Sequence, residues 1–281
     1  MGEETRDLAG GRLCIRDRGP VREIWLSRPD VHNALDEELI AALTLAFVEV
    51  GALPSPPRAV VLAAAGKSFC AGADLHYMRR IAAFTEEENR ADALRLAALF
   101  RSVHACPVFV LSRIQGAALG GGCGLVACCD LAVASATACF GFTEVRLGLV
   151  PATISSFVVA RIGTAKARAL FPTGEIFDAA EAQRIGLVDR VVAPERLDAE
   201  IDSVLELLLS AAPDASREAK ALADRAAGWS ATGSAAEEAA ALIARLRALP
   251  EGREGITAFL EKRQPGWTQP WPPTAEPGGI P

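Results

Sequence analysis

Apolar runs and helical stripes alternate along the first two thirds of the chain. Ala59–Ala64 is a continuous apolar run, which is typical of a strand buried on both faces. Residues 36–50 carry apolar side chains at helical spacing, namely Leu39, Ile40, Leu43, Phe47 and Val50. A polar helical pattern at 86–103, with Thr85 as its expected N-cap, leads into a predicted strand at 108–114. Strands that alternate with helices predict an α/β fold.

The two ends of the chain depart from this alternation. Residues 1–11 are polar and glycine-rich, so we expect them to be loose, and 13–16 and 21–26 are predicted as two strands joined by a turn. From about residue 195 the sequence is alanine-rich, with helices predicted at 195–211, 214–227, 235–248 and 253–263. We expect the proline-rich tail to be disordered. These shifts predict a core at 12–194, a helical appendage at 195–264 and a tail at 265–281.

Composition and charge narrow the class of protein. The 281 residues are 51% hydrophobic and carry a formal net charge of −6, which disfavours nucleic-acid binding. The apolar run at 108–111 is far too short to cross a membrane. Seven cysteines, an odd number, lie largely in apolar runs and follow no signal peptide, which favours reduced thiols in a cytoplasmic protein. The three histidines do not pair with cysteines at metal-binding spacing, so we expect no metal site.

The most unusual segment is the glycine-rich stretch at 114–135. Gly120, Gly121 and Gly122 are consecutive at the predicted start of a helix, although glycine lowers helix stability. Close packing against a neighbouring segment would explain them. They would also let a ligand approach the helix N-terminus, whose free N–H groups suit an anion or a developing oxyanion.

A second glycine turn favours the ligand interpretation. Residues 69–75 and 120–125 both place small residues where a strand gives way to a helix. If the two turns lie side by side, one backbone N–H from each can point at the same spot. Two donors fixed toward a carbonyl oxygen would stabilise an enolate, typically by about 3–4 kcal/mol per well-placed donor.

Five segments carry a family pattern in order: RPDVHNAL at 28–35, GKSFCAGADL at 66–75, IQGAALGGGCGL at 114–125, FGFTEVRLGLVP at 140–151 and EGITAFLEKR at 254–263. Together they resemble the motifs of the crotonase (enoyl-CoA hydratase/isomerase) superfamily. The resemblance implies a crotonase-like spiral of repeated ββα units with a C-terminal helical trimerisation region, assembled as a homotrimer or a dimer of trimers. It also implies a coenzyme A thioester as substrate. Because coenzyme A is then part of the substrate, no separate cofactor is expected.

The resemblance assigns roles to individual positions. The oxyanion-binding N–H groups of the family correspond to Ala73 and Gly121. The residues around the pantetheine and adenine parts of coenzyme A correspond to Ala71, Asp74, Leu75 and His76, although the family often has a cation at the last position. Phe259 and Lys262 match a C-terminal pair that can reach the coenzyme A of a neighbouring subunit. On its residue type alone, Lys262 is equally well explained as a solvated cation at a helix end.

One acidic residue of the family pattern is missing. Many family hydratases use two glutamates, of which the second corresponds to Glu144 and the first would fall at Gly124. Apolar neighbours of Glu144 would raise the pKa of its carboxyl group, so that this one group could take a proton from water and return one to carbon. The alternative is a glutamate that is solvated or paired with Arg146. We interpret Asp130 as structural, and Ala152 stands where the isomerases, the dehalogenase and the hydroxyacyl-CoA hydrolase of the family have an acid.

These residues predict a hydratase that adds water reversibly across the C2–C3 double bond of a 2-enoyl-CoA with one carboxyl group. The combination of GGGCGL with FTEVRLGLVPATIS resembles the methylglutaconyl-CoA hydratase type most. That resemblance implies a β-branched substrate with a distal carboxylate, from leucine or isoprenoid breakdown, for which Arg146 is a candidate partner. Two alternatives stay open. One is a dehydratase or decarboxylase of polyketide β-branching, and the other is a catalytically silent scaffold that binds coenzyme A thioesters.

Overall fold

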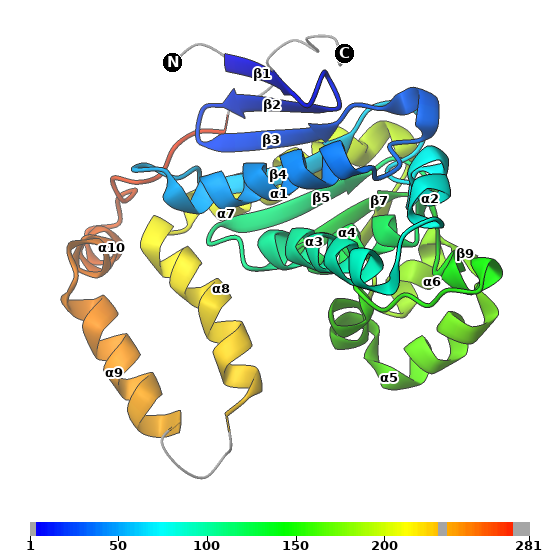
Figure 1. Ribbon diagram of the computed structural model, residues 1–281. Helices are drawn as coiled ribbons and strands as arrows, with labels where there is room; N and C mark the ends of the chain where they lie inside the picture. Colours follow the sequence, from blue (N-terminus) through cyan, green and yellow to red (C-terminus); the bar gives the residue numbers. More distant parts are fainter. Residues whose placement is uncertain (1–3, 230–234, 272–281) are drawn as a thin grey trace.

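A seven-stranded sheet forms the centre of the computed structural model, which describes residues 4–229 and 235–271. The order of its strands is β1-β2-β3-β4-β5-β7-β10 (Figure 1). Their bounds are β1 (Glu4–Leu8), β2 (Leu13–Arg18), β3 (Val21–Leu26), β4 (Ala59–Ala64), β5 (Phe109–Ile114), β7 (Leu131–Ser135) and β10 (Arg190–Val192). The first three strands pair antiparallel, and every neighbouring pair from β3 to β10 is parallel.

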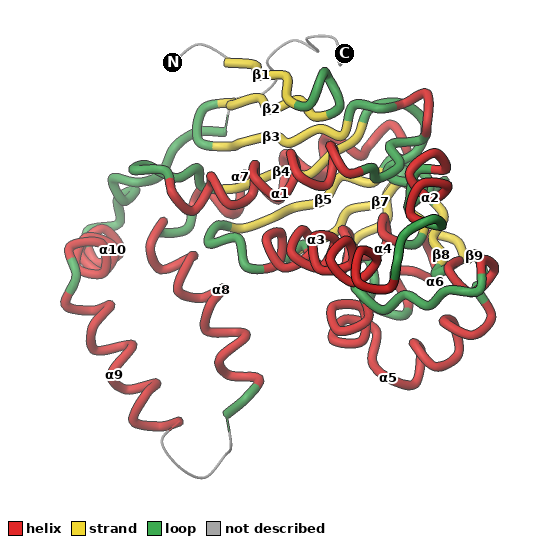
Figure 2. The backbone as a smooth tube through the Cα atoms, viewed as in Figure 1, coloured by secondary structure: helices red, strands yellow, loops and turns green. Residues whose placement is uncertain are grey.

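Helices cover both faces of this sheet (Figures 1 and 2). α1 (Glu37–Ala52) and α3 (Glu86–His104) pack on one face, and α7 (Leu197–Ser210) packs on the other. Alternate side chains of β4 therefore enter different cores. Val60 and Leu62 join the larger core under α1 and α3, whereas Val61 and Ala63 join the smaller core under α7. The continuous apolar run of β4 follows from this burial on both faces.

The parallel strands bring three loops to one edge of the sheet. β3, β4 and β5 are followed by the loops 27–36, 65–74 and 115–117. Since the carboxyl ends of parallel strands meet at the same edge, these loops are neighbours. Isolated bridges join them, one between Leu35 and Ala73 and one between Cys70 and Ala118. This edge carries both glycine turns.

A second, smaller unit of structure continues from that edge. Its sheet has the order β6 (Ala118–Leu119), β8 (Cys139–Gly141) and β9 (Ile176–Asp178). The helices that follow its strands are α4 (Gly121–Cys128), α5 (Ser155–Thr173) and α6 (Ala179–Arg184). The succession β5-β6-α4 is followed by β7-β8-α5. The predicted α/β fold with repeated ββα units is confirmed.

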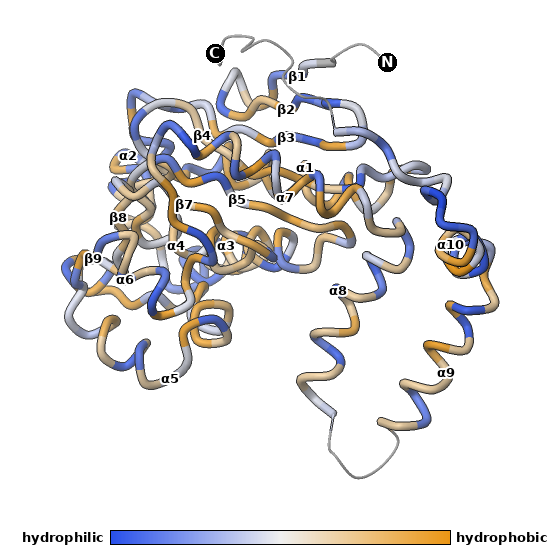
Figure 3. Tube along the Cα trace, turned by 180° about the vertical axis from the view of Figure 1, so that it is seen from behind, coloured by the Kyte–Doolittle hydropathy of each residue, from blue (hydrophilic) through white to orange (hydrophobic). Residues whose placement is uncertain are grey.

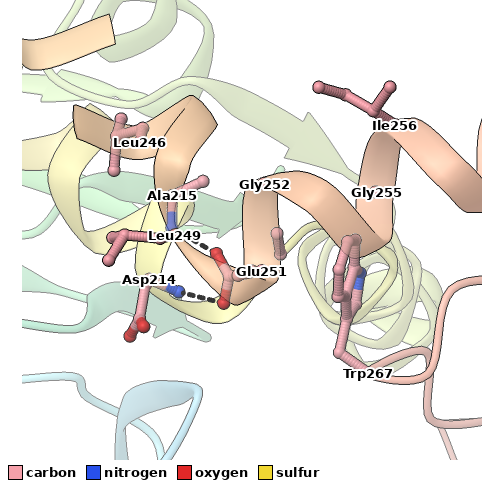
Figure 4. A pocket seen from close by; sticks show the side chains of 10 residues that line it. Asp214, Ala215, Leu246, Leu249, Glu251, Gly252, Gly255, Ile256 and Trp267 are labelled. Carbon is pink, nitrogen blue, oxygen red and sulfur yellow. Dashed lines mark hydrogen bonds between the residues drawn. The ribbon is translucent and has the colours of Figure 1, made fainter. Parts of the chain in front are cut away.

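The last three helices form an arm that extends from the body (Figure 1). They are α8 (Pro213–Ala227), α9 (Ala235–Ala248) and α10 (Pro250–Leu260). Figure 4 shows how α10 holds the start of α8: the Glu251 carboxylate accepts the backbone N–H groups of Asp214 and Ala215 at 2.9 and 2.8 Å. Apolar and polar residues alternate along α8 and α9 (Figure 3). In the described ranges, every helix is too short or too polar to cross a membrane.

The two ends of the chain are more structured than expected. Residues 4–8 form the edge strand β1, which pairs with β2 from Glu4↔Asp17 to Leu8↔Leu13, instead of a loose segment. The expected disorder of the tail is wrong for its first residues. The Trp267 indole donates to the Ser210 carbonyl at 3.2 Å, and Trp271 is 8% exposed and donates to Asp202 at 2.7 Å. The remaining tail, 272–281, lies outside the described residues.

Candidate active site

The three glycines at the start of α4 serve different purposes. A Cβ atom at Gly122 would lie 2.2 Å from the carbonyl oxygen of Cys70, so close packing requires this glycine. Gly120 is the N-cap with a φ of 51°, and a Cβ atom there would lie 3.2 Å from Oε1 of Glu144. Gly121 is the first helical residue, where N–H groups lack partners within the helix. The packing interpretation therefore holds for Gly122, whereas Gly120 and Gly121 leave the helix end open beside a carboxyl group.

Two unpaired backbone N–H groups lie near each other at this helix end. In the part of the chain that the structure describes, the N–H groups of Ala73 and Gly121 have no hydrogen-bond acceptor. Gly72 connects them: a Cβ atom there would lie 3.9 Å from the nitrogen of Gly121 and 3.1 Å from the carbonyl oxygen of Leu119. Ala73 itself is exposed. The structure thus brings the two glycine turns side by side.

Leu35 connects the two turns. Its N–H donates to the carbonyl of Gly72 at 2.7 Å, and its carbonyl accepts the N–H of Asp74 at 2.9 Å. Because the residues on either side of Ala73 both bond to Leu35, the Ala73 N–H faces away from Leu35. The Leu35 side chain, which is 2% exposed, lies 3.0 Å from where a Cβ atom of Gly121 would stand. One buried leucine therefore holds the peptide of Ala73 and contacts Gly121.

Glu144 places its carboxyl group over the N-cap of α4. It lies in the short 3₁₀ helix η2 (Thr143–Leu147). Its Oε2 atom is buried and has no hydrogen-bond partner within the described ranges. Burial raises the pKa of Glu144 above its ordinary value, although a hydrogen bond from its own backbone opposes this shift. No ion pair joins Glu144 to Arg146 in the described part of the chain, so the alternative of a paired glutamate is wrong.

The space beside Gly124 is filled by apolar side chains. A Cβ atom at Gly124 would lie 2.2 Å from Cγ2 of Ile154 and 2.9 Å from Cε1 of Phe100. Ile154 and Phe100 are 1% and 0% exposed, respectively. An acidic side chain at position 124 would have to displace both of these groups. Packing therefore accounts for the missing carboxyl group: Phe100 on α3 and Ile154 before α5 fill the space that a side chain at position 124 would need.

Comparison with known proteins agrees with this geometry. The family model described as enoyl-CoA hydratase/isomerase matches residues 16–270. The chain belongs to the enoyl-CoA hydratase/isomerase family. A crotonyl-CoA hydratase of Syntrophomonas wolfei is 34% identical over 92% of this chain and 98% of its own length.

Solved structures of other proteins share the fold of this chain over nearly their whole length. The enoyl-CoA hydratase of Shewanella pealeana has a TM-score of 0.87 at 36% identity, covering 91% of this chain and 96% of its own. Pseudomonas aeruginosa AtuE also has a TM-score of 0.87 at 36% identity, covering 92% of this chain and 100% of its own. The ββα core of this enoyl-CoA hydratase/isomerase family member is thus that of its relatives.

The residues expected around coenzyme A lie on the exposed side of the Ala73 turn, with one exception. Leu75, at 73% exposure, and His76 begin α2 (Leu75–Ile81) and face solvent. Ala71 donates its N–H to the carbonyl of His32 at 3.0 Å. Asp74 is only 4% exposed, because its carboxylate is used inside the protein. Any contact of Asp74 with coenzyme A would therefore involve its backbone.

The C-terminal pair stands apart from this site within one chain. Phe259 and Lys262 lie at the end of α10, on the opposite side of the molecule from α2 and α4 (Figure 1). Phe259 is 82% exposed. A contact with the coenzyme A of a neighbouring subunit stays a prediction for both residues.

Asp130 has the structural role that was predicted. Its carboxylate accepts the backbone N–H of Val110 at 2.7 Å and the Lys220 ammonium at 2.6 Å, and it thereby ties α8 to the sheet. Burial raises the pKa of Asp130, and the nearby Lys220 cation opposes that shift.

The sequence did not single out Leu35 or Phe100 as site residues. Each is an apolar side chain whose importance comes from a contact with a distant segment. Leu35 is the last residue of the first family motif, and its place in that motif is the only sequence feature that could have pointed to it.

Proposed function

We propose that the protein adds water reversibly across the C2–C3 double bond of a 2-enoyl-CoA. Its class as an enzyme, an enoyl-CoA hydratase, follows from the family match and from relatives of that name at about 35% identity. The observation that carries the mechanism is the Glu144 carboxyl group. It lies against Gly120, with one buried and unpaired oxygen, next to two unpaired N–H groups.

The two N–H groups act on the thioester carbonyl. Ala73 and Gly121 donate to its oxygen, which withdraws electrons from C3 and stabilises the enolate that forms when water adds there. The donors are held by backbone and need no reorganisation during the reaction. Leu75 and His76, exposed beside Ala73, are proposed to contact the coenzyme A portion.

Glu144 moves the proton. As a carboxylate it takes a proton from the water whose oxygen bonds to C3, and the resulting carboxylic acid gives that proton to C2 of the enolate. One water is consumed, C2 gains hydrogen and C3 gains hydroxyl, and Glu144 returns to its starting state. A pKa raised by burial makes the group a better base than an exposed glutamate and leaves the acid form accessible.

A β-branched substrate with a distal carboxylate, similar to methylglutaconyl-CoA, is the proposed acyl group, and leucine or isoprenoid breakdown is its proposed context. Arg146 supports this proposal. It is exposed, lies two residues from Glu144 and has no ion-pair partner in the described part of the chain. A guanidinium group suits a carboxylate, because it offers paired donors in a fixed plane.

The protein is further proposed to assemble as a homotrimer or a dimer of trimers. α10 exposes a row of apolar side chains that would otherwise face water, namely Ile256 (51% exposed), Phe259 (82%) and Leu260 (72%). Large exposed apolar groups of this kind mark association surfaces.

A panel of thioesters tests the reaction and its specificity. Wild-type protein is incubated with crotonyl-CoA, 3-methylcrotonyl-CoA, 3-methylglutaconyl-CoA and the acyl-carrier-protein thioester of the last acid, and products are followed by mass. We expect hydration of the coenzyme A thioesters, fastest for the one with a distal carboxylate, and loss of that preference in Arg146→Met. Tight binding without any turnover would contradict the hydratase and favour the silent scaffold. Loss of carbon dioxide, or action on the carrier-protein thioester alone, would favour the polyketide-type reaction.

A further inference from the structure

Arg28 joins the two loops that meet at the Ala73 turn. It lies in the loop after β3, and its side chain is 15% exposed. One terminal nitrogen, Nη2, bonds to the Asp74 carboxylate at 2.9 Å and pairs with the Asp36 carboxylate at 3.1 Å. The other, Nη1, donates to the carbonyl of Ala34 at 2.5 Å. We call Arg28, Asp36 and Asp74 the clamp.

Both carboxylates of the clamp also begin helices. Asp36 accepts the N–H of Leu39 at the start of α1, and Asp74 accepts the N–H groups of His76 and Tyr77 at the start of α2. Each aspartate thus gives one oxygen to a helix N-terminus and the other to Arg28. Burial alone would raise the pKa of Asp74, but the Tyr77 N–H, the Arg28 guanidinium and the His76 N–H together lower it. Asp74 is therefore held as a carboxylate.

The clamp encloses the peptide of Ala73. Three backbone hydrogen bonds join the loops it connects: Leu35 to Gly72, Asp74 to Leu35 and Ala71 to His32. The first of these loops carries two consecutive left-handed residues, His32 and Asn33, with φ values of 54° and 55°. A non-glycine residue keeps that conformation only where its surroundings enforce it. The Asn33 side chain holds this conformation, because its amide nitrogen donates to the carbonyls of Ala65 and Ser68 at 2.8 Å and its amide oxygen accepts the backbone N–H of Arg28 at 2.8 Å.

We propose that Arg28 is a positioning residue of the reaction, which aims the Ala73 N–H at the thioester carbonyl by holding Asp74 and Asp36 together. This inference rests on the proposed function, in which Ala73 and Gly121 share one carbonyl oxygen. Arg28 acts through the Asp74 backbone: Asp74 follows Ala73 directly, so any rotation of the Asp74 segment turns the Ala73 peptide. A lysine offers one compact ammonium group in place of a planar fork and cannot reproduce the contacts with Asp74, Asp36 and Ala34.

The test compares Arg28→Met and Arg28→Lys with Arg12→Met. Arg12 is the matched control because it also pairs with Asp36, at 3.2 Å, and with Glu38, at 2.9 Å, but has no contact with Asp74. The first measurement is steady-state hydration of crotonyl-CoA. A misplaced donor is expected to cost Arg28→Met about 10- to 100-fold in kcat, with KM within about threefold of wild type. Arg28→Lys should be intermediate, and Arg12→Met should keep wild-type kcat.

A spectroscopic measurement separates positioning from stability. The probe is 4-(dimethylamino)cinnamoyl-CoA, a conjugated thioester whose absorption moves to longer wavelength when its carbonyl is polarised. The probe should show the full shift to longer wavelength when it is bound to wild type or to Arg12→Met. It should show a smaller shift when it is bound to Arg28→Met. If Arg28 only stabilised the fold, Arg28→Met would have a lower melting temperature than wild type, but the spectral shift of the bound probe would be unchanged. If Arg28→Met does not fold, Asp74→Asn replaces it, because asparagine still accepts the N–H groups at the start of α2.

Each outcome decides between the two proposals. Normal kcat and a full spectral shift in both Arg28→Met and Asp74→Asn would overturn the clamp and leave the proposed function standing. Absence of both hydration and spectral shift in wild type would overturn the proposed function, and the clamp with it. A reduced shift and reduced kcat in the clamp variants, with Arg12→Met normal, would support the positioning role.

Discussion

At the residue scale, single atoms decide what the first turn of α4 can hold. Ile154 is a β-branched, fully buried side chain with few accessible rotamers, so it cannot easily move away from a Cβ atom at Gly124. Packing therefore requires glycine at this position independently of catalysis. A glutamate introduced alone would not restore a second carboxyl group, because the space it needs is occupied.

Gly124→Ala is expected to destabilise the protein. Overpacking against Ile154 costs about 1–3 kcal/mol and outweighs the gain of about 1 kcal/mol in helix propensity. Gly51→Ala in α1 is the matched control, because a Cβ atom there meets Pro107 at an ordinary 3.5 Å. Urea unfolding measures the free energy of unfolding of both variants. If Gly124→Ala were as stable as Gly51→Ala, the tight contact with Ile154 would be contradicted.

The raised pKa of Glu144 predicts the pH dependence of activity. Burial disfavours the charged carboxylate, so its pKa lies above the ordinary 4.5. The base form is needed to take a proton from water, and activity must therefore rise with pH through this pKa. We expect the acid limb of kcat/KM to have its midpoint above 4.5. A midpoint at or below the ordinary value would indicate that Glu144 is not buried in the working enzyme.

At the element scale, prediction from the sequence succeeded where a pattern repeats within one segment. β4 has the predicted bounds Ala59–Ala64, and Thr85 forms a full capping box with Glu88 at the start of α3. It failed where an element depends on a distant partner. β1 is polar and forms because β2 offers an edge. α2 is short, and its N-cap is Asp74, which Arg28 holds.

The same distinction applies to the site. Glu144, Ala73 and Gly121 were found because they lie inside motifs that a single segment carries. Leu35 and Arg28 lie inside the first motif as well, but no local pattern records their contacts with Gly72 and Asp74 on a distant loop. The same holds for the contact of Ile154 with the helix at Gly124. Their contribution became visible only in the folded structure.

Trp271 provides a test of the tail as a structural element. Its ring packs against the core under α7 and lies 5.0 Å from the Arg18 guanidinium carbon. Trp271→Ala should lower the free energy of unfolding by about 3 kcal/mol, the range of a buried aromatic truncation. Trp271→Phe keeps an aromatic ring but loses the bond to Asp202 and part of the buried indole, so it should cost about 1–2 kcal/mol, less than Trp271→Ala. Equal stability of wild type and Trp271→Ala would show that the tail does not contribute.

At the scale of the whole molecule, the active-site edge and the end of α10 lie on opposite sides of the chain (Figure 1). We expect this separation, and the exposed apolar row of α10, in a subunit whose α10 contributes to the active site of a neighbouring subunit. Sedimentation velocity is expected to give three or six times the chain mass, and Phe259→Asp should shift the protein toward monomer, because a charge replaces an 82% exposed apolar ring. A monomeric wild type at micromolar concentration would contradict the assembly.

In the proposed mechanism, the carboxyl group of Glu144 alone performs the proton transfers of hydration. The most direct test of this mechanism is kcat for the best thioester of the panel, measured for wild type, Glu144→Gln and the surface control Glu175→Gln, with binding of a saturated acyl-CoA measured in parallel. We predict a loss of about two to four orders of magnitude in Glu144→Gln, with unchanged binding and a normal control. If Glu144→Gln kept kcat within about threefold of wild type, another group would have to move the proton, and the single-carboxyl mechanism would be wrong.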